Sequence, residues 1–234
     1  MSRPVYVYFH ICTLGKRWEK IVENILTLIK NNLNPTSTFL TVLGDVAAVE
    51  KLVAKLSSNA QIIFSSINKK IYERQCLLEL YKKACEEECY ILYLHSKGVS
   101  PGKTTPMVDD WTNCMLYYLV EKNQHCLDLL NNDVADTVGI NIEINEPVVK
   151  QRLVSPVYKS DQHHYSGNFW WARSEHLRRL PATIGPKYLD PEFWIGATTG
   201  SKMACVWHTH VNHYKTRYPR TEYENKENLI IKEV

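Results

Sequence analysis

A short polar segment, His95-Ser96-Lys97-Gly98, follows the apolar run "YILYL" (90–94). Lysine offers a point charge for phosphate, histidine a hydrogen-bond donor or metal ligand, serine a hydroxyl group, and glycine close approach to the backbone. We interpret the four residues as a site that neutralises the diphosphate of a ligand. A polar strand end with a turn glycine is the structural alternative, which the tetrapeptide alone would favour.

Three acidic residues are candidates for catalysis. Asp190 and Glu192 lie beside aromatic residues in "LDPEFWIG" (189–196), and Asp110 lies in "VDDWTNCM" (108–115). A carboxylate in such surroundings can act as a general base on a hydroxyl group. Each residue also suits the first turn of a helix, where acids cap the chain or interact with the helix dipole. Both interpretations stay open, with Glu192 as the leading candidate for the base.

Two adjacent tryptophans, Trp170 and Trp171, stand in "HYSGNFWWARSEHL" (164–177). Neighbouring side chains of a strand point to opposite faces, so we expect one tryptophan to be buried and the other to face a ligand. An aromatic face with a few polar groups suits a sugar ring. Gly167 would permit a turn and Asn168 would bind a hydroxyl group. The alternative is that both tryptophans fill space between sheet and helix.

A histidine cluster lies near the end of the chain in "HTHVNHY" (208–214). His208 and His210 would share one face of a strand, which makes them candidate metal ligands. The spacing specifies no third, carboxylate ligand. We therefore favour structural or phosphate-contacting histidines over a metal site.

These polar residues require strands to position them. The first hundred residues alternate between short apolar segments typical of strands and longer amphipathic segments typical of helices. The expected strands are 4–12, 37–44, 60–66 and 89–94, and the expected helices are 16–33, 46–58 and 71–88. This order predicts an α/β fold with a mostly parallel sheet and helices on both faces. Ligands bind beyond the carboxyl ends of such strands, where His95 lies.

The second half predicts a more mixed arrangement. We expect a Pro-containing loop over 99–110, a helix over 110–132, a strand over 136–143, a strand or turn feeding a short helix over 164–181, a short helix from 190, and a strand over 202–210. Residues 1–220 would form a single domain. Residues 221–234 would be a loosely held polar tail or linker.

Composition excludes several classes. The 234 residues carry a net charge of +3, too little for a nucleic-acid-binding protein. The seven cysteines are odd in number and irregularly spaced, which favours reduced thiols over disulfides or a zinc site. No apolar run is long enough to span a membrane. We expect a cytoplasmic protein.

The order of these motifs resembles that of small GT-A-type glycosyltransferases of bacterial and viral polysaccharide synthesis, a group related to the rhamnan-synthesis transferases. The resemblance covers about 5–210 of the chain, and the combined order of motifs is more specific than any one of them. It is carried by "YLHSKG" (93–98), "DWTNCMLYY" (110–118), "DTVGIN" (136–141), "YSGNFWWARSEHLRRL" (165–180) and "EFWIG" (192–196).

The resemblance implies a GT-A-like, Rossmann-like sheet and the transfer of a hexose or deoxyhexose. The donor would be a UDP- or dTDP-sugar, and the acceptor a hydroxyl group of a growing glycan, in the host cytoplasm if the protein is viral. It further implies that His10, Cys12 and Thr13 bind the nucleotide. Segments 165–171 and 190–196 would shape the pocket for sugar and acceptor.

The resemblance leaves the use of a metal open. Most GT-A enzymes carry Asp-x-Asp after the fourth strand, where it binds a divalent ion, Mn²⁺ or Mg²⁺. This chain has His95-Ser96-Lys97 there, and a lysine can replace the charge of the ion. Such enzymes also often recruit a C-terminal histidine to the metal, which keeps His208 and His210 as candidates.

Other classes and outcomes remain open. The chain could be a non-catalytic domain that binds a nucleotide sugar or glycan, or another nucleotide-dependent α/β transferase such as a nucleotidyltransferase. A dehydrogenase or kinase fits poorly, because "HICTLGKRW" (10–18) lacks their glycine-rich phosphate loops. Inverting and retaining transfer are equally compatible with the sequence, since retention would need the acids only to orient hydroxyl groups.

Overall fold

The computed structural model describes residues 3–56, 58–99, 106–144, 155, 158 and 162–234. Its strands are β1 (Val5–Cys12), β2 (Ser37–Leu43), β3 (Gln61–Ser66), β4 (Tyr90–His95), β5 (Thr137–Ile140), β6 (Ile142–Ile144), β7 (His163–Tyr165), β8 (Trp170–Arg173), β9 (Lys202–Trp207) and β10 (Ile230–Glu233). Its α-helices are α1 (Trp18–Asn32), α2 (Val46–Lys55), α3 (Arg74–Glu86), α4 (Pro106–Leu116), α5 (Asn123–Asn131), α7 (Ser174–Arg178) and α8 (Asp190–Trp194). Shorter helical segments are η1 (Lys69–Ile71), the π-helical η2 (Tyr117–Glu121) and η3 (Arg220–Glu222). Half of the loop expected at 99–110, residues 100–105, lies outside the described residues, and 106–110 belong to α4, so the helix starts earlier than predicted.

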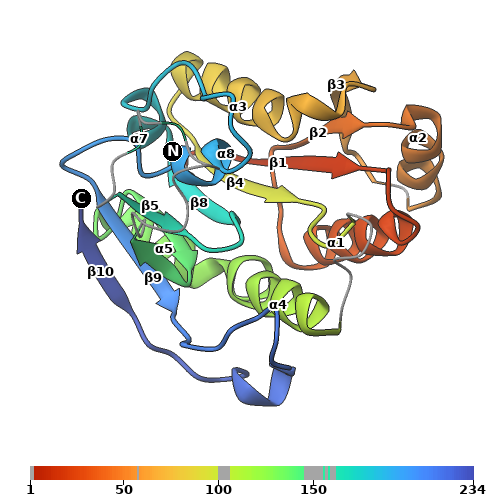
Figure 1. Cartoon of the computed structure of the whole chain (residues 1–234). Helices are drawn as coiled ribbons and strands as arrows, with labels where there is room; N and C mark the ends of the chain where they lie inside the picture. The colour runs from red at the N-terminus through yellow and green to blue at the C-terminus, as the bar shows by residue number, and fades with distance from the viewer. Residues whose placement is uncertain (1–2, 57, 100–105, 145–154, 156–157, 159–161) are drawn as a thin grey trace.

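An eight-stranded sheet forms the centre of the fold, in the order β10-β9-β5-β8-β4-β1-β2-β3 (Figure 1). Strand β1 pairs in parallel with both β2 and β4, and β2 pairs in parallel with β3. Strand β8 runs antiparallel to β4 and β5, and β10 runs antiparallel to β9. The predicted α/β class with a mostly parallel sheet is therefore confirmed, and the antiparallel strands belong to the second half of the chain.

Helices cover both faces of this sheet, as the alternating segments predict (Figure 1). One hydrophobic cluster joins the sheet to α1, α2, α4 and α5, and a second joins it to α3 and α7. Strand β4 supplies both clusters, since Leu92 and Leu94 belong to the first and Ile91 and Tyr93 to the second. A strand buried on both faces reads as a continuous apolar run, which explains the segment before His95.

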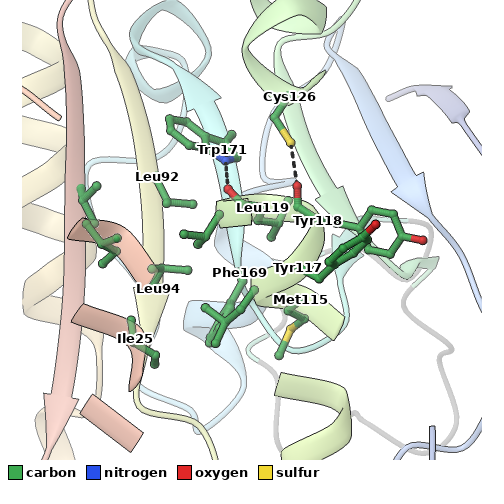
Figure 2. Packing of buried hydrophobic residues seen from close by; sticks show 14 of the residues in the cluster. Ile25, Leu92, Leu94, Met115, Tyr117, Tyr118, Leu119, Cys126, Phe169 and Trp171 are labelled. Atoms are coloured by element: carbon green, nitrogen blue, oxygen red, sulfur yellow. Dashed lines mark hydrogen bonds between the residues drawn. The ribbon is translucent and has the colours of Figure 1, made fainter. Parts of the chain in front are cut away.

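The expectation that one tryptophan of the pair faces a ligand is wrong. Trp170 and Trp171 do point to opposite faces of β8, but both are fully buried because each face is covered. The indole N–H of Trp170 donates to Asn168 Oδ1 at 2.9 Å. The indole N–H of Trp171 donates to the carbonyl oxygen of Leu119, in η2, at 2.8 Å (Figure 2). Both tryptophans hold the fold rather than contact a ligand.

We expect Trp171→Phe to lower the free energy of unfolding by about 1–3 kcal/mol, because it removes buried volume and the donor to Leu119. Urea unfolding followed by circular dichroism measures the change. Trp18→Phe is the control, since Trp18 is only partly buried and should cost less. Equal losses in the two variants would contradict the assigned role of Trp171.

The second half departs from the expected elements in three places. The helix expected over 110–132 is divided into α4, η2 and α5. The strand expected over 136–143 is divided into β5 and β6 at Asn141, whose φ is 50°. The tail expected over 221–234 is held more firmly than predicted, because β10 pairs with β9 and Tyr223 is buried. Apolar residues in "NLIIKEV" complete the sheet edge.

All seven cysteines are free thiols. Five of them are buried, as expected of cysteines that fill the core. Among the described residues, none of the helices combines the length and the apolar character that crossing a bilayer requires.

Candidate functional site

A cavity of about 260 Å³ lies at the carboxyl ends of β1 and β4. His10 and His95 are paired in register there, and the chain exits both strands toward the cavity. The described residues that line it include nine predicted site residues: His10, Cys12, His95, Ser96, Lys97, Gly98, Gly167, Asn168 and Glu192. The parallel sheet thus brings together strand ends that are 85 positions apart in the chain.

Backbone and hydroxyl groups tie these strand ends together. The Cys12 N–H donates to Ser96 Oγ at 2.8 Å, and the Ser96 N–H donates to the carbonyl oxygen of His10 at 2.9 Å. Thr13 takes no part in the described lining. Its Oγ1 accepts from the Asp45 N–H at 2.7 Å, which fixes the start of α2. Cys12 and Ser96 therefore shape the cavity wall, whereas Thr13 holds the N-terminal end of α2.

His95 supplies no positive charge to the predicted diphosphate site at neutral pH. Burial, followed by the nearby charge of Lys97, lowers the pKa of His95 to about 3. The neutral ring donates from Nε2–H to the carbonyl oxygen of Gly167 at 3.0 Å. Burial likewise lowers the pKa of His10 to about 4. Of the four residues expected to neutralise a diphosphate, Lys97 is therefore the one that offers a positive charge at neutral pH.

Lys97 lies against an aromatic stack supplied by α4 and the C-terminal segment. Its Nζ is 4.0 Å from the centre of the Trp111 ring, a cation–π distance. The Trp111 ring stacks in turn on His213, with 5.2 Å between centroids and 9° between planes. The motif "DWTNCM" thus supports the lysine, a contact that its spacing did not reveal.

Gly167 connects the two sides of the cavity. Its φ is +95°, and an added Cβ would lie 2.6 Å from Met115 Sδ and 3.0 Å from the Trp111 ring. Only glycine fits this turn without strain. The Gly167 carbonyl accepts from His95, and its N–H donates to Glu192 Oε1 at 3.1 Å. The turn therefore sets the position of Glu192 relative to the end of β4.

The other two predicted acids do not reach the described cavity lining. Asp190 is fully buried and accepts from the backbone N–H groups of Ser155 at 2.7 Å and Lys187 at 2.8 Å. Asp110 forms an ion pair with Arg217, Nε to Oδ2 at 2.5 Å. Both carboxylates are occupied in holding neighbouring segments, so Glu192 alone of the three predicted acids remains a candidate base.

The histidine pair also lies apart from the described cavity lining. His208 and His210 have ring centroids 5.0 Å apart. Within the described ranges, no group of three or more His, Cys, Asp or Glu side chains is arranged to hold a metal ion. The donor set around these histidines therefore does not match a protein-only Mn²⁺ or Mg²⁺ site.

Glu73 is a lining residue that the sequence did not identify. It immediately precedes α3, but its side chain makes no capping hydrogen bond to that helix. Instead it lines the cavity and accepts a hydrogen bond from the Tyr93 hydroxyl group. Burial raises the pKa of Glu73, and the charge of Glu192 adds to the effect. An acid at a helix start looks like an ordinary cap in the sequence, so no local signal distinguished it.

Three partly exposed tyrosines also line the cavity: Tyr72, Tyr188 and Tyr214, whose exposed fractions are 38%, 47% and 61%. The rings of Tyr72 and Tyr188 meet edge to face at 5.3 Å. Arg74 fixes the neighbouring loop, because its Nε–H donates to the carbonyl oxygen of Gly185 at 2.7 Å. Such an aromatic rim provides apolar faces for a ring-shaped ligand.

Acidification should destabilise the protein through histidines that are buried in the neutral form. In His176, Nε2–H donates to Ile195 O at 2.8 Å and Nδ1 accepts from Ser201 Oγ at 3.0 Å, and burial lowers its pKa to about 4. An unfolded histidine titrates near 6.5, so this stabilisation is complete above that pH and is lost as the pH falls toward 4.

We expect the free energy of unfolding to fall by on the order of 1–2 kcal/mol for His176 alone between pH 7 and pH 5. Urea unfolding at a series of pH values measures the slope. In His176→Gln the free energy of unfolding should fall less steeply with decreasing pH than in wild type. An unchanged slope in that variant would contradict the assigned neutral state.

Comparison with known proteins gives likenesses of fold. No family model matches the chain, and no curated protein matches it. The structure of S. aureus TarS 1–349 in complex with UDP aligns at 10% identity and a TM-score of 0.45, covering 82% of this chain and 54% of that one. This chain thus spans about half the length of TarS 1–349.

Two further solved structures align over most of both chains. A 4-diphosphocytidyl-2C-methyl-D-erythritol synthase aligns at 10% identity and a TM-score of 0.47, covering 95% of this chain and 96% of that one. A cytidylyltransferase from Leptospira borgpetersenii aligns at 11% identity and a TM-score of 0.46, covering 93% and 80%.

Proposed function

We propose that the protein is a glycosyltransferase that moves a hexose or deoxyhexose from a UDP- or dTDP-sugar to a hydroxyl group of a glycan. The observation that carries the proposal is the placement of Lys97 and Glu192 on the lining of one cavity at the carboxyl ends of β1 and β4. A cation for the leaving group and a base for the attacking group are the two functions that such a transfer requires.

Lys97 would contact the diphosphate of the donor. Negative charge develops on this group as its bond to the sugar breaks, and a fixed ammonium group stabilises that charge. The contact with Trp111 limits where the long side chain can go. His10 and Cys12 would line the nucleotide side, since both lie at the end of β1 on the cavity wall.

Glu192 would act on the acceptor. In an inverting reaction its carboxylate takes the proton of the acceptor hydroxyl group, the acceptor oxygen bonds to the anomeric carbon, and the bond from that carbon to the diphosphate breaks. In a retaining reaction the same carboxylate would orient the sugar. Glu192 is suited to either role because Gly167 N–H fixes one of its oxygens.

The mixed charge of the cavity suits a ligand with separate polar parts. Of its described lining residues, Glu73 and Glu192 are carboxylates and Lys97 is an amine, while His10 and His95 are neutral at pH 7. A donor that places its diphosphate near Lys97 and its hydroxyl groups near the carboxylates satisfies both kinds of group.

A panel of UDP-, dTDP- and GDP-sugars, incubated with the protein and simple glycan acceptors, tests this proposal. We expect acceptor-dependent release of the nucleotide with at least one donor. Parallel reactions with Mn²⁺ and with EDTA show whether an added ion assists Lys97. Binding without release would instead support a non-catalytic sugar-nucleotide-binding domain, and the absence of both binding and release would overturn the proposal.

A further inference from the structure

We propose that Glu73 determines ligand specificity by binding two adjacent hydroxyl groups on one ring of the nucleotide sugar. The ring is either the ribose or the transferred sugar, which share the chemistry of a vicinal diol. This inference rests on the proposed function and adds to it the part of the ligand that the buried wall of the cavity recognises.

The first support is position. Glu73 follows η1, precedes α3, and lines the same cavity as His10 and Glu192. The residue before it, Tyr72, has a φ of 48° and a ψ of −136°, which is unusual for a residue other than glycine. This bend directs the chain so that Glu73 lines the cavity instead of capping α3.

The second support is that Glu73 is held in place from the protein side. The Tyr93 hydroxyl group donates to its Oε2, and the Asn168 side chain also donates to the carboxylate. Asn168 is fixed in turn, because its Oδ1 accepts from the Trp170 indole N–H at 2.9 Å. Supporting groups that orient a carboxylate before a ligand arrives are typical of a binding site. The buried Trp170 therefore contributes to recognition indirectly.

The third support is electrostatic. None of the ion pairs between described residues includes Glu73. His10 is the basic side chain whose charge would interact with Glu73, and it is neutral at pH 7. A carboxylate has about four acceptor sites, more than the two donors among the described residues use. Two adjacent hydroxyl groups supply neutral donors at the spacing of two carboxylate oxygens, whereas a phosphate would be repelled.

Calorimetric titration of wild-type protein, Glu73→Gln and the control Glu50→Gln tests the inference. Glu50 is an exposed acid on α2, away from the described cavity lining. The probes are UDP, 2′-deoxy-UDP, 3′-deoxy-UDP and UDP-glucose. We expect Glu73→Gln to weaken binding of the diol-bearing probe by roughly 10- to 100-fold, as expected for a hydrogen bond to a charged group, and Glu50→Gln to bind like wild type.

The probes distinguish the two sources of the diol. If the ribose is recognised, wild type prefers UDP to both deoxy analogues, and Glu73→Gln loses that preference. If the transferred sugar is recognised, Glu73→Gln weakens the binding of UDP-glucose but leaves the affinity for UDP unchanged. A Glu73→Gln variant that binds all four probes like wild type overturns the inference while leaving the proposed function intact. A wild-type protein that binds none of them, and none of the donors in the panel, overturns both.

A second variant keeps the test informative if Glu73→Gln folds poorly. Tyr93→Phe leaves the carboxylate in place and removes the hydroxyl group that orients it. We expect this variant to bind the same probe roughly three- to tenfold more weakly, with the affinity for the other probes unchanged. A uniform loss over all probes would indicate a structural effect and would count against the inference.

Discussion

Replacing Lys97 with methionine should lower the affinity for UDP by roughly 10- to 100-fold, the cost of a lost hydrogen bond between charged groups. Methionine keeps much of the side-chain length and can still pack against Trp111, so the change removes mainly the charge. Because the histidines of the described lining are neutral, that lining would keep little positive charge for a diphosphate. Calorimetric titration with UDP measures the loss, and turnover of the donor found in the panel should fall at least as far.

The matched control is Lys51→Met. Lys51 is an exposed residue of α2 outside the described cavity lining, and its replacement changes the net charge by the same amount. Wild-type affinity in Lys51→Met would show that long-range attraction contributes little. If Lys97→Met kept wild-type affinity for UDP, the diphosphate would not be bound where we propose.

The second large effect concerns Glu192. Glu192→Gln should reduce kcat by roughly 10²- to 10⁴-fold in an inverting enzyme, the usual contribution of a general base. The affinity for UDP should change little, because glutamine still offers an oxygen to the Gly167 N–H. Steady-state kinetics with varied acceptor measures kcat and KM separately.

Asp190→Asn separates the chemistry from the fold at the same helix. Asp190 is buried and holds the chain before α8 by backbone hydrogen bonds. Its replacement should therefore lower the thermal midpoint of unfolding, while kcat measured well below that midpoint should change little. Glu192→Gln should show the reverse pattern. A Glu192→Gln enzyme with unchanged kcat would exclude a proton-transfer role.

Much of the fold was predictable because burial patterns are local. The apolar segments at 4–12, 37–44, 60–66 and 89–94 correspond to β1 to β4, and the amphipathic segments between them correspond to α1 to α3. Parallel pairing then places the ends of β1 and β4 together. The prediction that ligands bind at these strand ends therefore brought His10, Cys12 and Lys97 to one place, and all three line the cavity. The position of the cavity at these strand ends is what the element order predicts.

Side-chain environments were less predictable, because they depend on segments far away in the chain. Trp170 is buried since β8 inserts between β4 and β5 and is covered on both faces. His95 is neutral because burial, together with the nearby charge of Lys97, outweighs its hydrogen bond to the Gly167 carbonyl, which by itself raises the pKa. Neither fact has a signature at the residue itself.

Acidic residues were the hardest to assign. Asp190 and Glu192 are two positions apart, yet one is buried in a backbone network and the other lines the cavity. Glu73 could not be distinguished from a helix cap, because the bend at Tyr72 that redirects it is a tertiary feature. In each case the direction of one side chain, rather than the type of residue, decides the role.

The most direct test of the central claim is the crystal structure of the protein with UDP bound. We predict that the diphosphate lies within hydrogen-bond distance, about 3 Å, of Lys97 Nζ at the carboxyl ends of β1 and β4. A nucleotide bound elsewhere on the protein, with Lys97 still packed on Trp111 and making no phosphate contact, would contradict the account.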